Sequence, residues 1–545
     1  MKTILLIMII MLSSINLSAK TAPSIEWAKS YGGNGYDQAT SIDNTKDGGY
    51  IICGSTGSNN YDVNGNHGES DYWIIKLNAN GKIEWQKCLG GTNGEGTNFI
   101  KQTSDGGYIV VGDSFSNDGD VTGNHGGADC LIFKLDSVGS IQWQKCFGGK
   151  RNEKANSIIQ TSDGGYIFAG TTISIDGDVF GKHNELDEKY QDHVYFSDCW
   201  IVKLDSNGSI QWQKCLGGNN NDQAKSIQQT SDGGYIVAGS TESHDGDVSG
   251  FHGDTTNILY IYPDYWLVKL NSLGEIEWQK CYGGTSYDWA YSIINTIDGG
   301  YALTGISHSN DGDVIGNHST GYYPDFWTLK LSALGEIEWQ KCNGNYYNDG
   351  ARSIIQTQDG FVIIGYASSF DGGENASHGF EDYGIVKLSL DGKTEWQKMF
   401  GSYGGDWPEA IIQSQDGGYV AVGYASEKNG DVTNFYGKRD FWVLKLSPEG
   451  DDGIKTLPST QIGLRLYPNP VEDRLSIEYN LDEPENVQIV VYSLLGEEML
   501  SVNCGLQSEG GHLYQINTDK LPQGMYKLIL RAGENQFPTK FIKVK

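Results

Sequence analysis

The chain has 545 residues, among them 74 glycines, 32 tyrosines and 14 tryptophans, and aromatic residues make up 12% of it. This composition excludes an intrinsically disordered chain, which would be poor in aromatic residues, and disfavours a helix bundle, because glycine and large aromatic residues prefer turns and strands. The 39 basic and 69 acidic residues give a net charge of −30, so we expect no binding to nucleic acid or to an anionic membrane surface.

The first residues have the pattern of an export signal. Lys2 precedes an apolar run at residues 4–12 and then small residues that end at Ala19, which is the order of a secretory signal peptide. We therefore expect a signal peptide over residues 1–19. The apolar run is short for a membrane span, and no other stretch is long enough. The first cysteine is Cys53, which argues against lipid attachment at the cleavage site.

Three motifs each occur seven times over residues 20–447. Asp-Gly-Gly-Tyr, or Asp-Gly-Phe in the sixth copy, starts at Asp47, Asp105, Asp163, Asp232, Asp298, Asp359 and Asp416. A strand pattern around Trp-Gln-Lys and an Asp-x-x-x-x-Lys-Leu pattern recur with it, at spacings of 57 to 69 residues. Such a period indicates a repeat architecture. Each repeat has four short strand patterns separated by turn residues, which predicts an all-β, seven-bladed β-propeller with four-stranded blades.

The two ends of this array predict a closed ring. The array begins with a lone Ile25-Glu26-Trp27 strand, and its last repeat lacks a strand after Leu446. The N-terminal strand can therefore complete blade seven and remove an open sheet edge; the alternative is an open repeat stack. The turn positions predict that Lys76 lies opposite Glu84, and that Lys445 lies opposite Glu26 at the closure.

The stretch from Leu204 to Trp212 resembles the tryptophan-docking repeat of propellers of the quinoprotein-like and kelch-like type. It is one residue shorter between Asp and Gly and lacks the usual Thr. The adjacent cysteine pair that quinone-binding dehydrogenases of this type commonly have is missing as well. The resemblance therefore implies the blade architecture and not the cofactor.

The C-terminal region carries a second resemblance. Leu466-Tyr-Pro-Asn-Pro, a Leu-Gly turn at Leu495, Leu521-Pro-Gln-Gly-Met-Tyr526 and a basic end follow one another. In this order they resemble the type A sorting domain of the type IX secretion system, over about 80 residues. The resemblance implies a small immunoglobulin-like β-sandwich at residues 464–545 after a linker at 448–463. It also implies export by the type IX machinery to the outside of the cell or its outer surface; the alternative is an ordinary immunoglobulin-like binding domain.

Seven acidic residues, one before each predicted innermost strand, form the first candidate site. If these strands line the channel, the acids ring one mouth of it and could together hold a hard cation such as Ca²⁺. The alternative, which we favour, is that each acid accepts backbone N–H bonds of its own loop and that no cofactor is bound. The residues are Asp37, Glu95, Glu153, Asp222, Asp288, Asp349 and Asp406.

The loops between the second and third strands contain Asp-Gly-Asp-Val, as at residues 118–121, with His125, His183, His252 and His318 nearby in successive repeats. The spacing is not that of an EF-hand, and a metal-free turn is the interpretation we favour. In repeats three to five these loops are longer and aromatic, which suits sugar stacking or protein contact; the alternative is that they only cover their own blades. The candidate ligand-binding residues are Tyr190, Tyr195, Phe196, Tyr260, Tyr262, Tyr322 and Tyr323.

The nine cysteines suit an oxidising compartment, and their odd number leaves at least one unpaired. The same turn positions place Cys130 opposite Cys146, and Cys199 opposite Cys215, so these pairs are candidates for cross-strand disulfides. The alternative is that the cysteines act as small buried apolar side chains.

We expect a secreted or cell-surface propeller, monomeric, that binds glycan or protein through its loop face and meets the type IX machinery through its C-terminal domain. An extracellular carbohydrate-active enzyme, a glycoside hydrolase or lyase, is the alternative, because acidic residues are abundant. No nucleophile elbow or Ser-His-Asp pattern supports catalysis, and Arg151, Arg352 and Arg439 are too scattered in the sequence for a sialidase-type site.

Overall fold

The computed structural model describes residues 22–183, 196–253, 261–318, 322–369, 378–450, 455–456, 462–493, 498–533 and 535–544. The predicted signal peptide lies outside them. The chain divides into two compact units, with the boundary between Glu449 and Gly450. All regular elements of the described residues are β-strands. In this part of the chain no helix is long and apolar enough to cross a membrane.

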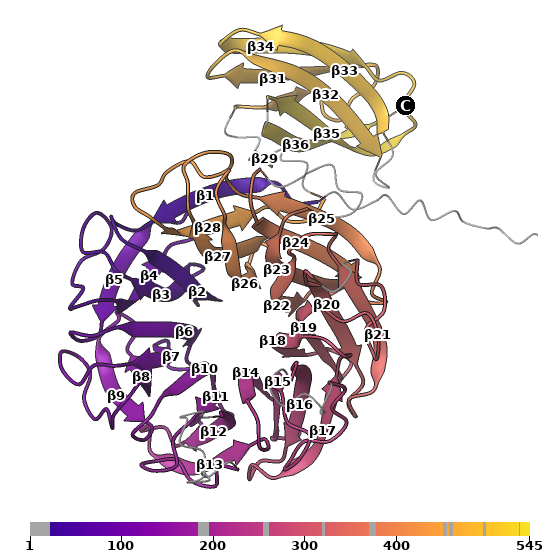
Figure 1. Ribbon diagram of the computed structural model, residues 1–545. Helices are drawn as coiled ribbons and strands as arrows, with labels where there is room; N and C mark the ends of the chain where they lie inside the picture. The colour runs from indigo at the N-terminus through magenta and orange to yellow at the C-terminus, as the bar shows by residue number, and fades with distance from the viewer. Residues whose placement is uncertain are drawn as a thin grey trace, which may run out of the picture. The chain divides into compact units, whose positions relative to one another are not determined.

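The first unit contains seven four-stranded antiparallel sheets arranged in a ring, which confirms the predicted propeller (Figure 1). Blades one to three consist of β2 (Asp37–Asn44), β3 (Tyr50–Thr56), β4 (Asp71–Leu77), β5 (Ile83–Leu89); β6 (Glu95–Gln102), β7 (Tyr108–Ser114), β8 (Asp129–Leu135), β9 (Ile141–Phe147); and β10 (Glu153–Gln160), β11 (Tyr166–Thr172), β12 (Asp198–Leu204), β13 (Ile210–Leu216). Blades four and five consist of β14 (Asp222–Gln229), β15 (Tyr235–Thr241), β16 (Asp264–Leu270), β17 (Ile276–Tyr282); and β18 (Asp288–Asn295), β19 (Tyr301–Ser307), β20 (Asp325–Leu331), β21 (Ile337–Asn343). Blade six consists of β22 (Gly350–Gln356), β23 (Gly360–Ala367), β24 (Asp382–Ser389), β25 (Thr394–Phe400), and blade seven of β26 (Trp407–Gln413), β27 (Tyr419–Ala425), β28 (Asp440–Leu446) and β1 (Ile25–Tyr31).

Strand β1 closes the ring by pairing antiparallel with β28, as the ends of the array predict. The predicted pairing of Lys445 with Glu26 is wrong by one residue. Trp27 lies opposite Lys445, because the strand shifts register between Ile25 and Trp27 and Glu26 occupies the bulge. A bulge bends the strand and re-aims its side chains, so Glu26 Oε2 still lies 3.3 Å from Lys445 Nζ.

The same bulge recurs in the outer hairpin of blades one to six, and it overturns the disulfide expectation. Cys130 lies opposite Phe147 and Cys146 opposite Leu131. A shift of one residue turns a side chain to the other face of the sheet, so Cys130 and Cys146 belong to different apolar cores. Cys199 and Cys215 are separated in the same way. All nine cysteines are free.

The repeated tryptophan of each outer strand packs against the next blade. Trp85, for example, lies over Gly139 in the β8–β9 turn; a Cβ atom on this glycine would be 2.9 Å from the indole ring. Gly139 also has a φ of +78°, a conformation that glycine adopts without steric cost. Trp27, Trp143, Trp212, Trp278 and Trp339 contact the corresponding turn glycines, so the docking that the sequence resembles joins neighbouring blades.

The Asp-Gly-Gly-Tyr motif anchors a buried lysine of the third strand. In blade four, Asp232 accepts bonds from Thr230 Oγ1 and Gly234 N and lies 2.9 Å from Lys269 Nζ. The Thr230 hydroxyl and Lys269 stabilise its ionised form and lower its pKa to about 2. Lys269 is nearly buried and also contacts Glu277 at 2.7 Å. The motif therefore holds the third strand against its own hairpin.

The second unit is a two-sheet β-structure. One sheet has the order β29-β36-β35-β32-β33 and the other β30-β31-β34. The strands are β29 (Lys455–Thr456), β30 (Arg465–Tyr467), β31 (Arg474–Leu481), β32 (Glu485–Ser493), β33 (Glu498–Gln507), β34 (Gly510–Asn517), β35 (Gly524–Ala532) and β36 (Asn535–Lys543). Alternate residues of facing strands, such as Ile477, Ile489 and Leu528, form one apolar core.

The two sequence motifs of this unit have local structural tasks. Within Tyr-Pro-Asn-Pro, Asn469 Oδ1 accepts a bond from Ile542 N (2.9 Å), and the residue after the motif, Val471, donates to Ile542 O (2.8 Å). The motif thereby attaches to the C-terminal strand. Within Leu-Pro-x-Gly-x-Tyr, the Tyr526 hydroxyl donates to Pro522 O (2.7 Å) and closes the turn before β35.

Candidate functional site

The seven acids before the innermost strands are buried and bonded within their own loops. Asp222 Oδ2 accepts bonds from Gly218 N (2.8 Å) and Ser243 Oγ (2.9 Å), and Asp222 Oδ1 accepts from the Thr241 hydroxyl. Asp37, Glu95, Glu153, Asp288, Asp349 and Asp406 accept equivalent bonds from the connecting segment four residues earlier. Each acid therefore fixes the connecting segment that precedes its own strand. Among the described residues, no group of three or more His, Cys, Asp or Glu side chains is placed to hold a metal ion.

Burial raises the pKa of all seven acids, and their hydroxyl and N–H donors offset this only in part. The pKa reaches about 7 at Asp222, Asp288, Asp349 and Asp406. These acids therefore hold the connectors between blades, and Asp222, Asp288, Asp349 and Asp406 change charge near neutral pH.

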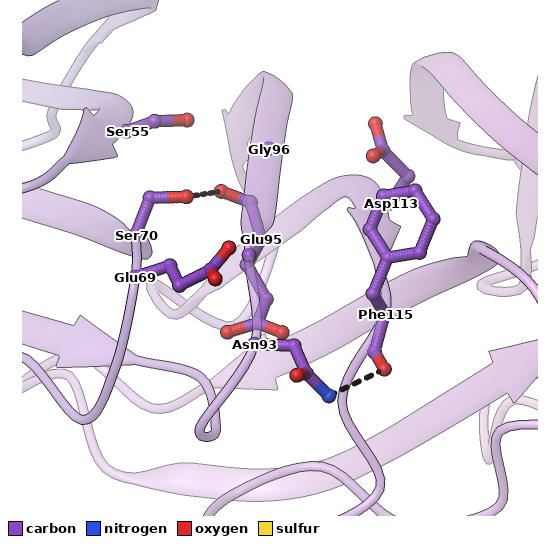
Figure 2. A pocket seen from close by; sticks show the side chains of 9 residues that line it. Ser55, Glu69, Ser70, Asn93, Glu95, Gly96, Asp113 and Phe115 are labelled. Atoms are coloured by element: carbon purple, nitrogen blue, oxygen red, sulfur yellow. Dashed lines mark hydrogen bonds between the residues drawn. The ribbon is translucent and has the colours of Figure 1, made fainter.

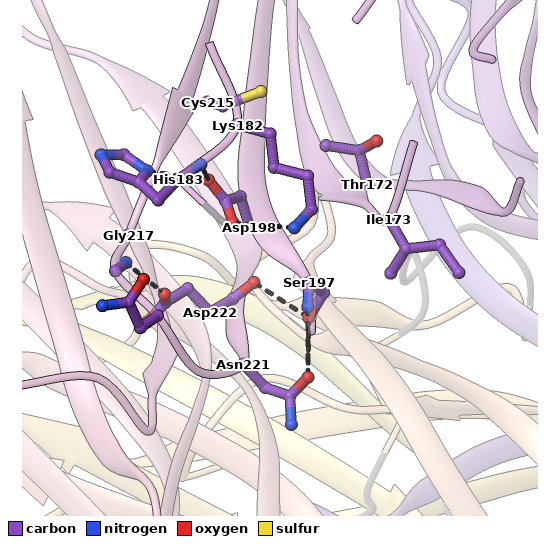
Figure 3. Close-up of polar contacts among 12 residues, drawn as sticks. Thr172, Ile173, Lys182, His183, Ser197, Asp198, Cys215, Gly217, Asn221 and Asp222 are labelled. Carbon is purple, nitrogen blue, oxygen red and sulfur yellow. Dashed lines mark hydrogen bonds and ion pairs between the residues drawn. The ribbon is translucent and has the colours of Figure 1, made fainter. Parts of the chain in front are cut away.

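The repeated histidines bind a second buried acid, the first residue of each third strand. In blade three, His183 Nδ1 lies 2.8 Å from Asp198 Oδ2, and Lys182 Nζ lies 3.7 Å from Asp198 Oδ1 (Figure 3). His183 Nε2 is in turn 3.3 Å from Asp247 in blade four. His67, His125 and His252 make the same bridge to the next blade. The bridges therefore join neighbouring blades.

The Asp-Gly-Asp-Val loops form hydrogen bonds with the connectors, the segments that join the outermost strand of one blade to the innermost strand of the next. Asp118 Oδ1 accepts a bond from Thr92 N (2.8 Å), and Asp120 N donates to Gly90 O (2.9 Å). Val121 is fully buried beneath the turn. Together with the connectors, these loops form one face of the propeller, which we call the loop face.

Four consecutive blades carry an aromatic residue at one equivalent position on the loop face, two residues before the third strand. The four are Phe196, Tyr262, Tyr323 and Phe380, and we call them the aromatic arc. The residue after each of them accepts a backbone bond from the acid that precedes or begins the next innermost strand. The arc therefore lies beside the inner strands that line the channel. Blades one, two and seven have Glu69, Gly127 and Lys438 at this position.

The arc includes three residues singled out from the sequence and adds one. Phe196 and Tyr262 are half-buried, whereas Tyr323 is 47% exposed and its neighbour Tyr322 is 86% exposed. Phe380 is 70% exposed. It is not among the residues predicted from the sequence, because the loop of blade six has no insertion. Its position two residues before Asp382 is the signal that could have identified it. The candidates Tyr190, Tyr195 and Tyr260 lie outside the described residues.

Tyr262 belongs to a larger aromatic cluster between blades four and five. Its ring centroid lies 4.2 Å from that of Tyr287, which also contacts Trp289 at 5.6 Å and His308 at 5.8 Å. Trp289 keeps 36% of its surface exposed. Tyr287 and Trp289 come from the connector and from β18, so only the fold brings them to Tyr262.

The opposite side of the loop face is acidic. A broad hollow of about 690 Å³ between blades one and two is lined by Glu69, Glu95 and Asp113 together with Ser70 and Phe115 (Figure 2). Ser70 Oγ donates to Glu95 O (3.1 Å) across it. The loop face is thus chemically asymmetric: the aromatic arc lies on blades three to six, and this carboxylate-lined hollow lies between blades one and two.

Comparison with known proteins identifies the C-terminal unit. Residues 465–545 match the family described as "Secretion system C-terminal sorting domain", which confirms the predicted type IX sorting domain. The chain is thus a β-propeller protein exported by the type IX secretion system, and it is secreted or displayed on the cell surface. No curated protein sequence matches.

Solved structures similar to the chain include YCF48 bound to D1 peptide, with 8% identity and a TM-score of 0.36 over 78% of this chain and 99% of that one. A puromycin hydrolase is 10% identical with a TM-score of 0.41, over 82% and 59%. PorZ, a bacterial surface component of the type IX secretion system of Porphyromonas gingivalis, is 10% identical with a TM-score of 0.28, over 97% and 75%.

Proposed function

We propose that this type IX-exported propeller binds a glycan across the aromatic arc on its loop face. The observation that carries the proposal is the arc itself, because an aromatic residue stands at the same position on four adjacent blades and at none of the other three. Aromatic rings pack against the apolar faces of sugars, and the hydroxyl groups of Tyr262 and Tyr323 can also hydrogen-bond with sugar hydroxyls. A row of such rings on neighbouring blades suits an extended chain of sugars.

The surroundings favour a glycan over a folded protein partner. Tyr322 and Tyr323 project from the face, whereas Tyr262 is braced by Tyr287 and Trp289. Braced rings present a platform with little entropy left to lose on binding. The acidic hollow at Glu69 and Asp113 adds hydrogen-bond acceptors for sugar hydroxyls at the far side of the same face.

A glycan array probed with the full chain tests this proposal, with Tyr262→Ala and Tyr323→Ala as arc variants. Tyr61→Ala is the matched control, because Tyr61 is a 69% exposed tyrosine on the loop of blade one. We expect retention of specific glycans by the wild type and the control, and at least tenfold weaker retention by the double arc variant. Retention that survives loss of both tyrosines contradicts the proposal. Release of shorter sugars from a retained glycan would instead establish the enzymatic alternative.

A further inference from the structure

The central channel has a lining that differs from blade to blade. Each innermost strand has a β-bulge at its fourth repeat position, counted from the buried acid. A bulge re-aims its side chain, and here the bulged residues line a channel cavity of about 320 Å³. Around the ring they are Thr40, Asn98, Asn156, Lys225, Tyr291, Arg352 and Glu409. A structural role shared by all blades would not require this variety.

Three cations meet in this cavity although the chain carries a net charge of −30. Lys154, Lys225 and Arg352 all line it, with Glu409 as the acid among the lining residues. Lys154 Nζ lies 3.7 Å from Asp113, and Arg352 Nε lies 4.0 Å from Glu409. Within the part of the chain that the structure describes, Lys225 contacts no acid at ion-pair distance. The enclosed groups therefore carry an excess of positive charge.

Arg352 is held in place by aromatic rings, and its Nε atom is left without a hydrogen bond from the residues that the structure describes. Its guanidinium lies over Tyr291 at 4.4 Å, with Tyr366 and Trp407 at 5.4 and 5.8 Å. Stacking on aromatic rings fixes the plane of the guanidinium and leaves its edge to bind other groups. The buried Nε atom has no hydrogen-bond partner among the described residues, and such a group costs free energy unless a partner is supplied.

Lys225 is the group most affected by its neighbours. Burial in the channel wall, together with the charges of Lys154 and Arg352, lowers its pKa to about 8. Lys154 and Arg352 each have an acid nearby, whereas Lys225 has none at ion-pair distance among the described residues, so its charge beside theirs is unfavourable. A bound anion would relieve this repulsion and would satisfy Arg352 Nε at the same time.

We propose that the channel binds a small molecule with one carboxylate and several hydroxyl groups, the chemical class of the sugar acids, and that Lys225 and Arg352 hold the carboxylate. The rest of the cavity lining can hydrogen-bond with the hydroxyl groups of the ligand. It includes one serine from each of four consecutive blades: Ser157, Ser226, Ser292 and Ser353. Ser226 Oγ accepts a bond from Ile293 N (3.3 Å), so its O–H is left to donate. Glu409 can accept bonds from hydroxyl groups, and its negative charge opposes a doubly charged phosphate or sulfate more strongly than a singly charged carboxylate.

The cavity volume agrees with this class of ligand, since about 320 Å³ lies at the small end of the range of ligand pockets. The site does not use the aromatic arc, and its ligand is bound inside the ring rather than on the loop face. A failure of glycan binding by the arc would therefore leave this proposal standing, and the reverse also holds.

Titration calorimetry of the full chain with D-glucuronate tests the proposal, with D-glucose as the neutral analogue. We expect glucuronate to bind at least tenfold more tightly than glucose, inorganic phosphate or sulfate. Equal binding of glucose, or tighter binding of phosphate or sulfate, overturns it, as does the absence of glucuronate binding. A parallel titration with trigalacturonate distinguishes a free sugar acid from the acidic end of a polysaccharide. Binding of glucuronate but not trigalacturonate indicates a free sugar acid, and binding of both compounds indicates the end of a polysaccharide. Either result agrees with the proposal.

Single substitutions test whether Lys225 and Arg352 form the binding site. Lys225→Gln and Arg352→Gln should each weaken glucuronate binding 10- to 100-fold, as expected for loss of a charge-assisted hydrogen bond. Lys214→Gln, on the outer strand β13, is the matched control and should bind as the wild type does. Lys225→Gln removes a like charge and should keep or raise the melting temperature, so weak binding by this variant cannot come from unfolding. Wild-type affinity in both channel variants overturns the proposal.

Discussion

Trp27 lies directly opposite Lys445 in the strand pair that closes the propeller, although the two residues stand at opposite ends of the repeat array. Trp27 also packs over Gly81 in blade one, so one side chain joins the last blade to the first. The pairing removes two open sheet edges, which would otherwise invite association with other chains.

Trp27→Ala should lower the free energy of unfolding by about 2 kcal/mol, because a half-buried aromatic ring is lost. Trp143→Ala removes the equivalent ring between blades two and three and is the control. Hydrogen exchange should show faster opening of β1 and β28 only in Trp27→Ala, because β1 is held in the ring by β28 and this docking contact. Equal protection of β28 in both variants would show that the closure does not depend on Trp27.

Gly139→Ala should destabilise the protein more than Gly106→Ala. Both glycines have positive φ, +78° and +84°, so each substitution costs about 1–2 kcal/mol of backbone strain. A Cβ at Gly139 also meets Trp85, whereas one at Gly106 meets nothing within 4 Å. Overpacking adds about 1–3 kcal/mol at Gly139. Denaturant unfolding measures the difference, and equal losses would mean that Trp85 moves away at no cost.

Lys269→Met should lower the free energy of unfolding by about 1–2 kcal/mol, because it leaves Asp232 and Glu277 without their shared cation. Both acids are more than 40% exposed, and solvent therefore limits the loss. Lys280→Met removes a more exposed pair with Glu336 and should cost less than about 0.5 kcal/mol. Chemical denaturation of the two variants checks this order. A larger loss in Lys280→Met would contradict the assignment of the buried lysine as the anchor of the third strand.

The melting temperature should rise as the pH falls from 8 to 5. Asp222, Asp288, Asp349 and Asp406 have pKa values near 7 because of burial, well above the ordinary value of an unfolded aspartate. The folded state therefore binds more protons in this window, and the stability present at low pH is lost as the pH rises through 7.

The groups that face these acids do not reverse the sign. Hydrogen bonds to the third-strand acids raise the pKa of His67, His183 and His252, which acts in the same direction. Asp232 and its equivalents Asp47, Asp105, Asp163 and Asp298 have pKa values of about 2 and stay ionised throughout the window. Thermal unfolding at constant ionic strength is the measurement, and a melting temperature that rises from pH 5 to pH 8 would refute the raised pKa values of these buried acids.

Several features of the fold can be predicted because they are local. Six copies of Asp-Gly-Gly-Tyr and one of Asp-Gly-Phe, with strand patterns on both sides, predict seven blades. The unpaired ends at Ile25 and Leu446 predict the closure. The hairpin bulge at Glu26 and its equivalents cannot be predicted, since an extra residue leaves the alternation of apolar side chains almost unchanged. The bulge moves each cysteine candidate by one position, and one position is enough to put Cys130 and Cys146 on opposite faces of a sheet.

Only part of the candidate site can likewise be predicted from the sequence. Insertions and their aromatic residues are visible in a single repeat, so Tyr262 and Tyr323 can be identified, whereas Tyr287 and Trp289 join them only through the packing of blade four on blade five. The repeat, the strand order and the sorting domain follow from the amino-acid pattern alone, because turn residues and strand patterns act over a few neighbouring positions. The identity of the side chains that meet in the channel depends on the folded ring, because closure and the inner-strand bulges bring together residues that the sequence keeps far apart. Lys154, Lys225, Arg352 and Glu409 come from four different blades.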